Sequence, residues 1–195
     1  MFDVPDDPLV IARARKGDLA AMETLYRTYE EPVYTLGRRL LRRPEEAEEV
    51  LQETFLEVLK SLRGFRGDGP LGFWIRKIAV NKALMRIRAR GHRAEAAEPA
   101  GADLSEDKAG RPSLKAGALL ERLHLEAAFT RLSEVARAVV WLHDVEGFTH
   151  DEIAQMMKKT PSFSKSQLAR AHARLRDYLT GDLAEPPCIQ AMKTS

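Results

Sequence analysis

The sequence predicts an all-α fold of two small helical domains joined by a flexible linker, the second ending in a helix-turn-helix. Large apolar residues recur at helical spacing in both halves of the 195-residue chain, and no stretch alternates as strands do. Between the halves, residues 92–117 are rich in Ala, Glu, Asp, Gly and Pro, and hold too few large apolar residues to bury a core. We therefore expect a first domain at 1–91, a linker at 92–117, a second domain at 118–180 and a tail at 181–195.

The composition agrees with this class and argues against several functions. Hydrophobic residues make up 44% of the chain, charged residues make up 31%, and the net charge is only +2, so any nucleic-acid signal must lie in local patches. The one cysteine, Cys188, rules out an intrachain disulfide and a cysteine zinc site. No apolar run approaches the roughly 20 residues that span a bilayer, and the first residues lack the basic start of a signal peptide. We expect a cytoplasmic protein with no membrane insertion.

Start signals mark the first two helices. Asp6 or Asp7 ahead of Pro8 predicts a capped helix with proline in its first turn, and Asp18 is placed to cap the next helix. Pro32 lies within that second helix and lacks an N–H group, so we expect it to kink or restart the helix.

An acidic segment is followed directly by a basic one in the second half of the first domain. Residues 45–57, in a helix opened by Pro44, carry six acidic side chains and no basic one. Residues 60–93 carry ten Lys or Arg and one acid, a net charge of +9. A glycine-rich loop separates the two, and a helix resumes at Phe73 and ends near Gly91. Opposite charges on neighbouring segments suggest two partners, with the acidic face docking a protein and the basic face holding opened DNA.

The loop and the helix after it combine aromatic residues with cations. Arg63 and Arg66 flank Phe65, and Phe73 and Trp74 follow the glycines. Basic grooves that carry aromatic rings hold single nucleic-acid strands, because cations follow the phosphates while rings or pockets take the bases. The alternative is that the rings belong to the core and the cations form a solvated face.

The second domain has the layout of a helix-turn-helix. Thr149 and Glu152 are spaced as a capping box for a short helix, residues 158–161 form the turn, and a longer basic helix follows. In such a unit the second helix enters the major groove and its N-terminal residues reach base edges. A plain helical hairpin with a solvated basic face is the alternative. The polar residues on the outer faces of the second helix are Ser164, Lys165, Gln167, Arg170 and Arg174.

No motif predicts catalysis. The five histidines are scattered, and phosphate-binding, dinucleotide-binding and serine-nucleophile motifs are absent from the sequence. The adjacent pairs His143–Asp144 and His150–Asp151 are expected to point apart on a helix and to serve in capping or at the surface. We expect no enzyme, no metal, no cofactor and no small-molecule substrate.

Two parts of the chain resemble the extracytoplasmic-function (ECF) sigma factors of bacterial RNA polymerase. Residues 45–62 (EEAEEVLQETFLEVLKSL), 65–68 (FRGD) and 73–90 (FWIRKIAVNKALMRIRAR) resemble the second conserved region of that family. Residues 142–179, notably GFTHDEIAQMM and KSQLARAHARLR, resemble its fourth region. A match in both domains is more specific than the helix-turn-helix pattern alone.

The resemblance implies an alternative-sigma transcription initiation factor that binds core RNA polymerase, directs it to specific promoters and helps to melt the −10 element. The first domain would bind the clamp helices of the largest catalytic subunit through Glu49, Gln52, Glu53, Phe55, Leu56 and Glu57. Its loop would capture a flipped base, and the −10 contacts would come from Arg63, Phe65, Arg66, Asp68, Trp74, Lys77, Asn81 and Arg86. The second domain would place its basic helix at the −35 element, and the linker would run toward the RNA exit path. An anti-sigma factor is a further candidate partner.

The recognition helix departs from the family pattern. The family usually begins this helix with P-V-G-T-V-K-S-R, whereas residues 160–167 read TPSFSKSQ. Gln167 stands where Arg is common, and His172 also replaces a usual Arg. We expect an altered −35 preference or a weaker contact there. Gly69–Pro70 also stiffens the loop, so the −10 base preference does not follow from the family.

Two other functions stay open at this point. The chain could be a stand-alone helix-turn-helix regulator with a helical sensor or dimerisation domain, or a nucleic-acid enzyme or accessory factor with an unrecognised site. A sigma factor needs core polymerase before it binds specific DNA, whereas a stand-alone regulator binds duplex DNA by itself.

Overall fold

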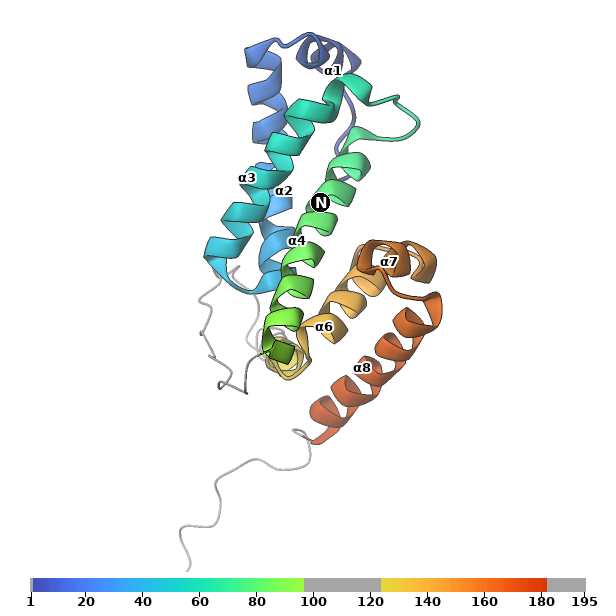
Figure 1. The fold of residues 1–195 in the computed structure, drawn as a ribbon. Coiled ribbons are helices and arrows are strands. Elements are labelled where there is room, and N and C mark those ends of the chain that lie inside the picture. Colours follow the sequence, from blue (N-terminus) through green and yellow to red (C-terminus); the bar gives the residue numbers. More distant parts are fainter. Residues whose placement is uncertain (1, 97–123, 182–195) are drawn as a thin grey trace, which may run out of the picture. The chain divides into compact units, whose positions relative to one another are not determined.

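The computed structural model describes residues 2–96 and 124–181, which fall into two compact units (Figure 1). Every regular element in these two ranges is helical and none is a strand, so the expected all-α class with two helical domains is confirmed. No helix within the described residues is long and apolar enough to cross a bilayer.

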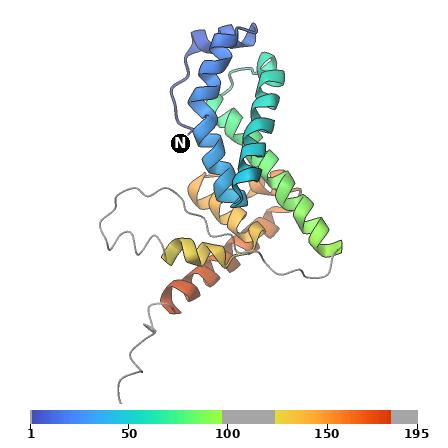
Figure 2. The same cartoon turned by 90° about the vertical axis from the view of Figure 1, so that its left-hand side faces the viewer.

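The first unit contains four α-helices and one short turn of 3₁₀-helix. Its elements are α1 (Pro8–Arg15), α2 (Leu19–Leu41), α3 (Pro44–Ser61), η1 (Leu62–Gly64) and α4 (Leu71–Ala96). Helices α2, α3 and α4 pack against one another, and α1 lies at the end of the unit where the chain leaves α3 (Figures 1 and 2). The connection between α3 and α4 is therefore positioned next to α1.

Apolar faces at helical spacing build the core of this unit. Leu36 and Leu40 of α2, Val50 of α3, and Ile75 and Leu84 of α4 are fully buried. Burying one such side chain stabilises a fold by about 1.5–3 kcal/mol relative to leaving it in water. The three long helices are therefore held together mainly by these apolar contacts.

Of the two outcomes expected at Pro32, a kink or a restart of the second helix, the restart is ruled out. Helix α2 runs through it without interruption. A proline in a helix interior costs about 3 kcal/mol through a lost hydrogen bond and a clash. Tyr29, Val33 and Leu36 on either side of it are fully buried, and their packing offsets this cost.

The boundaries of α4 differ from the sequence prediction at both ends. The helix begins at Leu71, two residues before Phe73, and it continues past Gly91 to Ala96. The first five residues of the expected linker, 92–96, are therefore helical, in keeping with the helix propensity of their Ala, Glu and Arg residues. The rest of the expected linker, 97–117, lies outside the described residues.

The second unit contains the helix-turn-helix. Its elements are a helix at 124–130, α6 (Glu134–Val140), the π-helical turn η2 (Trp141–Val145), α7 (His150–Met157) and α8 (Pro161–Gly181). Its core includes Val139, Leu142 and Ile153, all fully buried. The expected start of this domain near residue 118 and the tail after 181, with Cys188, lie outside the described residues.

The predicted turn chemistry of the second unit is confirmed. The Thr149 side chain accepts a hydrogen bond from the Glu152 N–H, and the Glu152 carboxylate accepts one from the Thr149 N–H, completing the capping box. Lys158 ends α7 in the left-handed conformation, and α8 begins at Pro161. The sequence predicted one helix before α7, whereas its last turn is π-helical, which is a common feature of functional segments.

Candidate nucleic-acid interface

The segment between α3 and α4, residues 63–71, is named here the glycine loop. Every residue from 63 to 70 is exposed except Phe65, which is half-buried. Leu71 is buried and anchors the far end of the loop. The loop is therefore a surface feature and not part of the core, so its backbone and side chains are accessible to a ligand.

Two aromatic rings meet at the base of the glycine loop. The Phe65 ring packs against the Trp74 ring with 5.2 Å between centroids and 41° between ring planes. Both side chains are half-buried. Neither ring belongs to the fully buried core, so both present an edge or face toward solvent, as stacking platforms for bases do.

Two open hollows flank this ring pair and share Gly64, Phe65 and Trp74 in their walls. The first has a volume of about 390 Å³, and its other lining residues are Glu57, Ser61 and Ile78. The second has a volume of about 470 Å³, and its other lining residues are Arg66, Asp68, Gly69, Pro70, Phe73 and Lys77. Sites of roughly 300–1,000 Å³ suit small planar molecules, so either hollow has room for one nucleobase.

Charge and aromatic surface surround the second hollow. Arg66 and Lys77 are exposed cations at its rim, and Asp68 adds an exposed carboxylate that can accept a hydrogen bond from a base amino group. The Phe73 side chain is 44% exposed, and the Arg76 guanidinium lies 4.7 Å from its ring centre. Asn81, also expected at the DNA, lies farther along α4 and is half-buried.

A row of ion pairs, named here the charge ladder, joins α3 to α4. Its rungs are Glu46 with Arg90 at 2.8 Å, Glu49 and Glu53 with Arg86, and Glu57 with Lys82 at 3.8 Å. The residues recur every three or four positions on each helix, so one side of α3 faces one side of α4 along the whole contact. The acidic and basic segments therefore partly neutralise each other.

The charge ladder corrects the role expected for Arg86. Burial alone would lower the pKa of its guanidinium, but the hydrogen bond and charge of Glu53, followed by those of Glu49, raise that pKa above its ordinary value. The structure therefore shows Arg86 paired with two carboxylates of α3, and we infer that it serves the contact between the helices and not the DNA surface. Glu49, Glu53 and Glu57 are correspondingly turned toward α4 and not displayed for a protein partner alone.

The outward face of α3 is partly apolar. Gln52 is exposed, Leu56 is 56% exposed, and Leu59, which the spacing had placed in the core, is 43% exposed. Phe55, expected at the polymerase, is only 6% exposed and packs against Tyr26 with 4.7 Å between ring centroids. Phe55 is thus a core residue, and Leu56 and Leu59 are the apolar groups that a partner can reach.

In the second unit, α8 displays most of its expected polar residues. Lys165, Arg170 and Arg174 are exposed, and Gln167 is half-buried. Ser164 is a correction, because its side chain is 1% exposed and its hydroxyl lies 3.0 Å from Nδ1 of His150. It joins α7 to α8 and cannot reach a base edge as it stands.

A histidine cluster that sequence reasoning missed lies beside this contact. The Asp144 carboxylate meets Nδ1 of His143 at 2.7 Å and Nε2 of His172 at 2.6 Å. The His143 ring stacks on the His150 ring with 4.5 Å between centroids. The expectation that His143 and Asp144 point apart is therefore wrong. The one sign of this cluster in the sequence was His172, which stands where the family usually has Arg.

The acidity of Asp144 reflects this setting. Its partial burial raises the pKa of the carboxyl group, but the hydrogen bonds and charges of His143 and His172 outweigh that effect and lower the pKa below its ordinary value. Within the described residues, no group of three or more His, Cys, Asp or Glu side chains is arranged to hold a metal ion. The cluster is thus a hydrogen-bonded contact between η2 and α8.

Comparisons with protein families match both units. Residues 25–93 match the family model for Sigma-70 region 2, and residues 122–175 match the model for Sigma-70, region 4. The RNA polymerase sigma-H factor of Pseudomonas aeruginosa is 28% identical over 197 residues, covering 95% of this chain and 100% of that protein. The ECF RNA polymerase sigma factor SigM of Mycobacterium tuberculosis is 30% identical over 173 residues, covering 89% of this chain and 84% of that protein.

Solved structures share the fold. The sigma factor RpoE of Bartonella quintana, in complex with the anti-sigma factor NepR, has a TM-score of 0.54 at 19% identity, covering 82% of this chain and 97% of that one. CnrH in complex with the cytosolic domain of CnrY has a TM-score of 0.52 at 20% identity, covering 89% and 97%.

Proposed function

The chain belongs to the extracytoplasmic-function sigma factors, alternative sigma factors that initiate transcription, and we propose that its glycine loop captures an unstacked base of the −10 promoter element. Such a factor binds core RNA polymerase and promoter DNA. The observation that carries the proposal is the pair of open hollows on either side of Phe65 and Trp74, in a loop that is exposed along its length.

The energetics of promoter opening favour such a site. Unstacking duplex DNA costs about 1.4 kcal/mol per base-pair step. Stacking one base on an aromatic side chain returns about 1–3 kcal/mol, which is enough to offset a step. A hollow that accepts only some bases returns this free energy selectively, so capture of one base both opens and reads the sequence.

The exposed cations of the first unit would hold the opened strand. Arg66 and Lys77 at the rim of the second hollow, with Arg63 at the start of the loop, are the groups we assign to phosphate contacts. Asp68 would accept a hydrogen bond from the captured base. Asn81 would contact the strand farther along α4.

Polymerase binding is assigned to the outward face of α3. Gln52, Leu56 and Leu59 form an exposed polar and apolar strip there, and apolar anchors commonly dominate protein interfaces. The carboxylates of the charge ladder would flank this strip. We propose that the chain performs no chemistry itself, acts in the cytoplasm and is bound by an anti-sigma factor, as the structurally similar RpoE is bound by NepR.

The −35 element is assigned to α8. Lys165, Gln167, Arg170 and Arg174 would face the major groove, where Gln pairs with adenine and cations meet guanine or phosphate. His172 replaces an Arg that the family pattern usually supplies, and its ring contacts Asp144. This supports an altered −35 preference.

Gel shifts with and without core polymerase test the proposed function. A promoter is first isolated by run-off transcription of genomic fragments with the purified chain and core enzyme. We expect a sequence-specific shift only when core polymerase is present. Specific binding of the same duplex by the chain alone, at similar affinity, would instead identify a stand-alone helix-turn-helix regulator.

A further inference from the structure

The first residues of the chain, 2–7, are named here the N-terminal strap. They precede the segment that matches the family model, which begins at residue 25. The Asp6 carboxylate accepts hydrogen bonds from the Leu71 N–H, with N–O distances of 2.9 and 3.2 Å. Leu71 is the last residue of the glycine loop and the first of α4, so the strap caps that helix from 65 residues away.

A close backbone approach fixes the strap in place. The Phe2 side chain is 3% exposed, and its ring stacks on that of Tyr29 with 6.5 Å between centroids. A Cβ atom on Gly72 would lie 2.1 Å from the Phe2 carbonyl oxygen, so only glycine permits this contact. Burial, followed by the charge of Asp6, raises the pKa of the Tyr29 phenol, in keeping with a strap that covers this ring.

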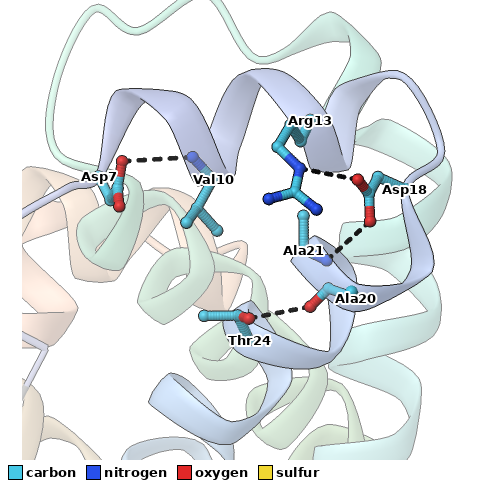
Figure 3. A network of polar contacts seen from close by, with 7 residues as sticks. All are labelled: Asp7, Val10, Arg13, Asp18, Ala20, Ala21 and Thr24. Carbon is cyan, nitrogen blue, oxygen red and sulfur yellow. Dashed lines mark hydrogen bonds and ion pairs between the residues drawn. The ribbon is translucent and has the colours of Figure 1, made fainter.

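The near end of the glycine loop is held by α1. The Arg15 guanidinium donates a hydrogen bond to the Arg63 carbonyl oxygen at 3.3 Å. Helix α1 is itself fixed on α2, because Arg13 forms an ion pair with Asp18 at 2.7 Å while Asp18 accepts a hydrogen bond from the Ala21 N–H (Figure 3). Asp7 caps α1 from the end of the strap. One N-terminal segment thus contacts both ends of the loop.

We propose that the N-terminal strap and Arg15 set the separation of the two ends of the glycine loop, with Asp6 as a positioning residue for base capture. This rests on the proposed function of the loop. The hollows are lined by residues of the loop and of the first turns of α4, so their shape depends on where Leu71 and Arg63 are held. Releasing Leu71 widens the range of loop conformations and weakens discrimination between bases.

The first test compares Asp6→Ala with Asp3→Ala in the full chain. Asp3 is an exposed carboxylate in the same strap, and none of the described contacts to α4 involves it. For Asp6→Ala we expect hydrogen exchange at the Leu71 amide to accelerate at least tenfold, while exchange at Leu36 in the core is unchanged. The Asp3→Ala variant should match the wild type at both positions. Equal protection of Leu71 in both variants would overturn the proposal.

Base selectivity with core polymerase provides the second readout. Run-off transcription is measured on promoters that carry each of the four bases in turn at every −10 position. We expect Asp6→Ala to lower the preference at the captured position at least threefold, while its affinity for core polymerase is unchanged. A faster Leu71 exchange with the wild-type preference retained would show that the strap has only a structural role.

A pair of glycine substitutions approaches the same contact from α4. Gly72→Ala should displace the strap and accelerate exchange at Leu71, whereas Gly91→Ala, where a Cβ meets nothing within 4 Å, should not. Alanine normally favours a helix over glycine, so a loss of protection at position 72 alone isolates the clash with Phe2. Identical exchange rates at Leu71 in the two variants would contradict the proposed role of the strap.

The two proposals fail separately. If the wild-type chain shows no base preference at any −10 position, base capture by the loop is wrong, and exchange at Leu71 still reports on the strap. If the wild type shows the preference but Asp6→Ala and Gly72→Ala leave it unchanged, the strap is not a positioning device and base capture stands.

Discussion

Lys77 and Arg86 are both cations on α4, yet their surroundings give them different tasks. Lys77 is exposed at the rim of a hollow and pairs with no carboxylate among the residues that the structure describes. The Arg86 side chain is 24% exposed and lies between Glu49 and Glu53. Charge alone does not separate the two residues, whereas the position of α3 does.

Substitutions at these two positions are expected to change different quantities. Lys77→Ala should reduce the salt dependence of open-complex formation by about 0.7 in the logarithmic slope, because one phosphate contact is lost, without changing stability. Arg86→Gln should lower the free energy of unfolding by about 1 kcal/mol and leave the slope unchanged. Salt titration of open complexes and urea denaturation measure the two quantities. A changed slope in Arg86→Gln with unchanged stability would return Arg86 to the DNA surface.

Burial of single residues is also where sequence reasoning reached its limit. Helical spacing placed both Phe55 and Leu59 on the core face of their helix, but the structure buries only Phe55 and leaves Leu59 43% exposed. Ser164 follows the turn where base-reading residues are expected, yet its hydroxyl turns inward to His150. Each outcome depends on a neighbouring helix whose rotation the local sequence does not specify.

Among the elements, helix starts with local caps were predicted well. Asp18 and Thr149 each accept a hydrogen bond from an N–H three residues later, so the cap and the helix it starts are adjacent in sequence. The start of α4 was missed because its cap is Asp6, 65 positions earlier. The charge ladder was missed for a similar reason, since both helices were visible but their mutual rotation was not.

The outward face of α3 makes a prediction about core polymerase. Leu56→Glu should reduce affinity for the core enzyme at least tenfold, about 1.4 kcal/mol, because an exposed apolar anchor becomes a charge. Leu19→Glu on α2, at an even more exposed position, is the matched control and should bind normally. Fluorescence titration of core polymerase measures both. Equal affinities would place the docking surface elsewhere.

The contact between α7 and α8 predicts a pH dependence. Burial lowers the pKa of His150, and the charges of His143 and Lys165 lower it further against the opposing charges of Asp151 and Asp144. The folded unit therefore binds the proton more weakly than the unfolded chain does. The stabilisation linked to neutral His150 is fully present at neutral pH. It is lost as the pH falls below about 6.5, the pKa of histidine in the unfolded chain.

Hydrogen exchange in α7 and α8 at pH 7.5 and 5.5 measures this loss. His150→Asn should flatten the change in protection between the two values, while His124→Asn, at an exposed position in the helix at 124–130, should retain it. A wild-type pH dependence in His150→Asn would assign it to other groups. The lowered pKa of Asp144 affects stability over a lower pH range. Its contribution is lost only as the pH falls below about 4.

At the scale of the whole molecule, two units with different surfaces serve one task. The first unit carries the glycine loop, the hollows and the outward strip of α3, and the second carries the basic face of α8. The family, the helical class and the helix-turn-helix could all be predicted from sequence, because motifs and caps are local. The strap, the charge ladder and the histidine cluster could not, because each joins residues from separate elements.

The most direct measurement of the central claim is a base-substitution scan of the −10 element by run-off transcription, comparing the wild-type chain with Phe65→Ala. Phe65 lines both hollows and is half-buried, so its loss alters the capture site more than the core. The account predicts that Phe65→Ala weakens the base preference at one −10 position and leaves the −35 preference intact. An unchanged preference at every −10 position would contradict base capture by the glycine loop.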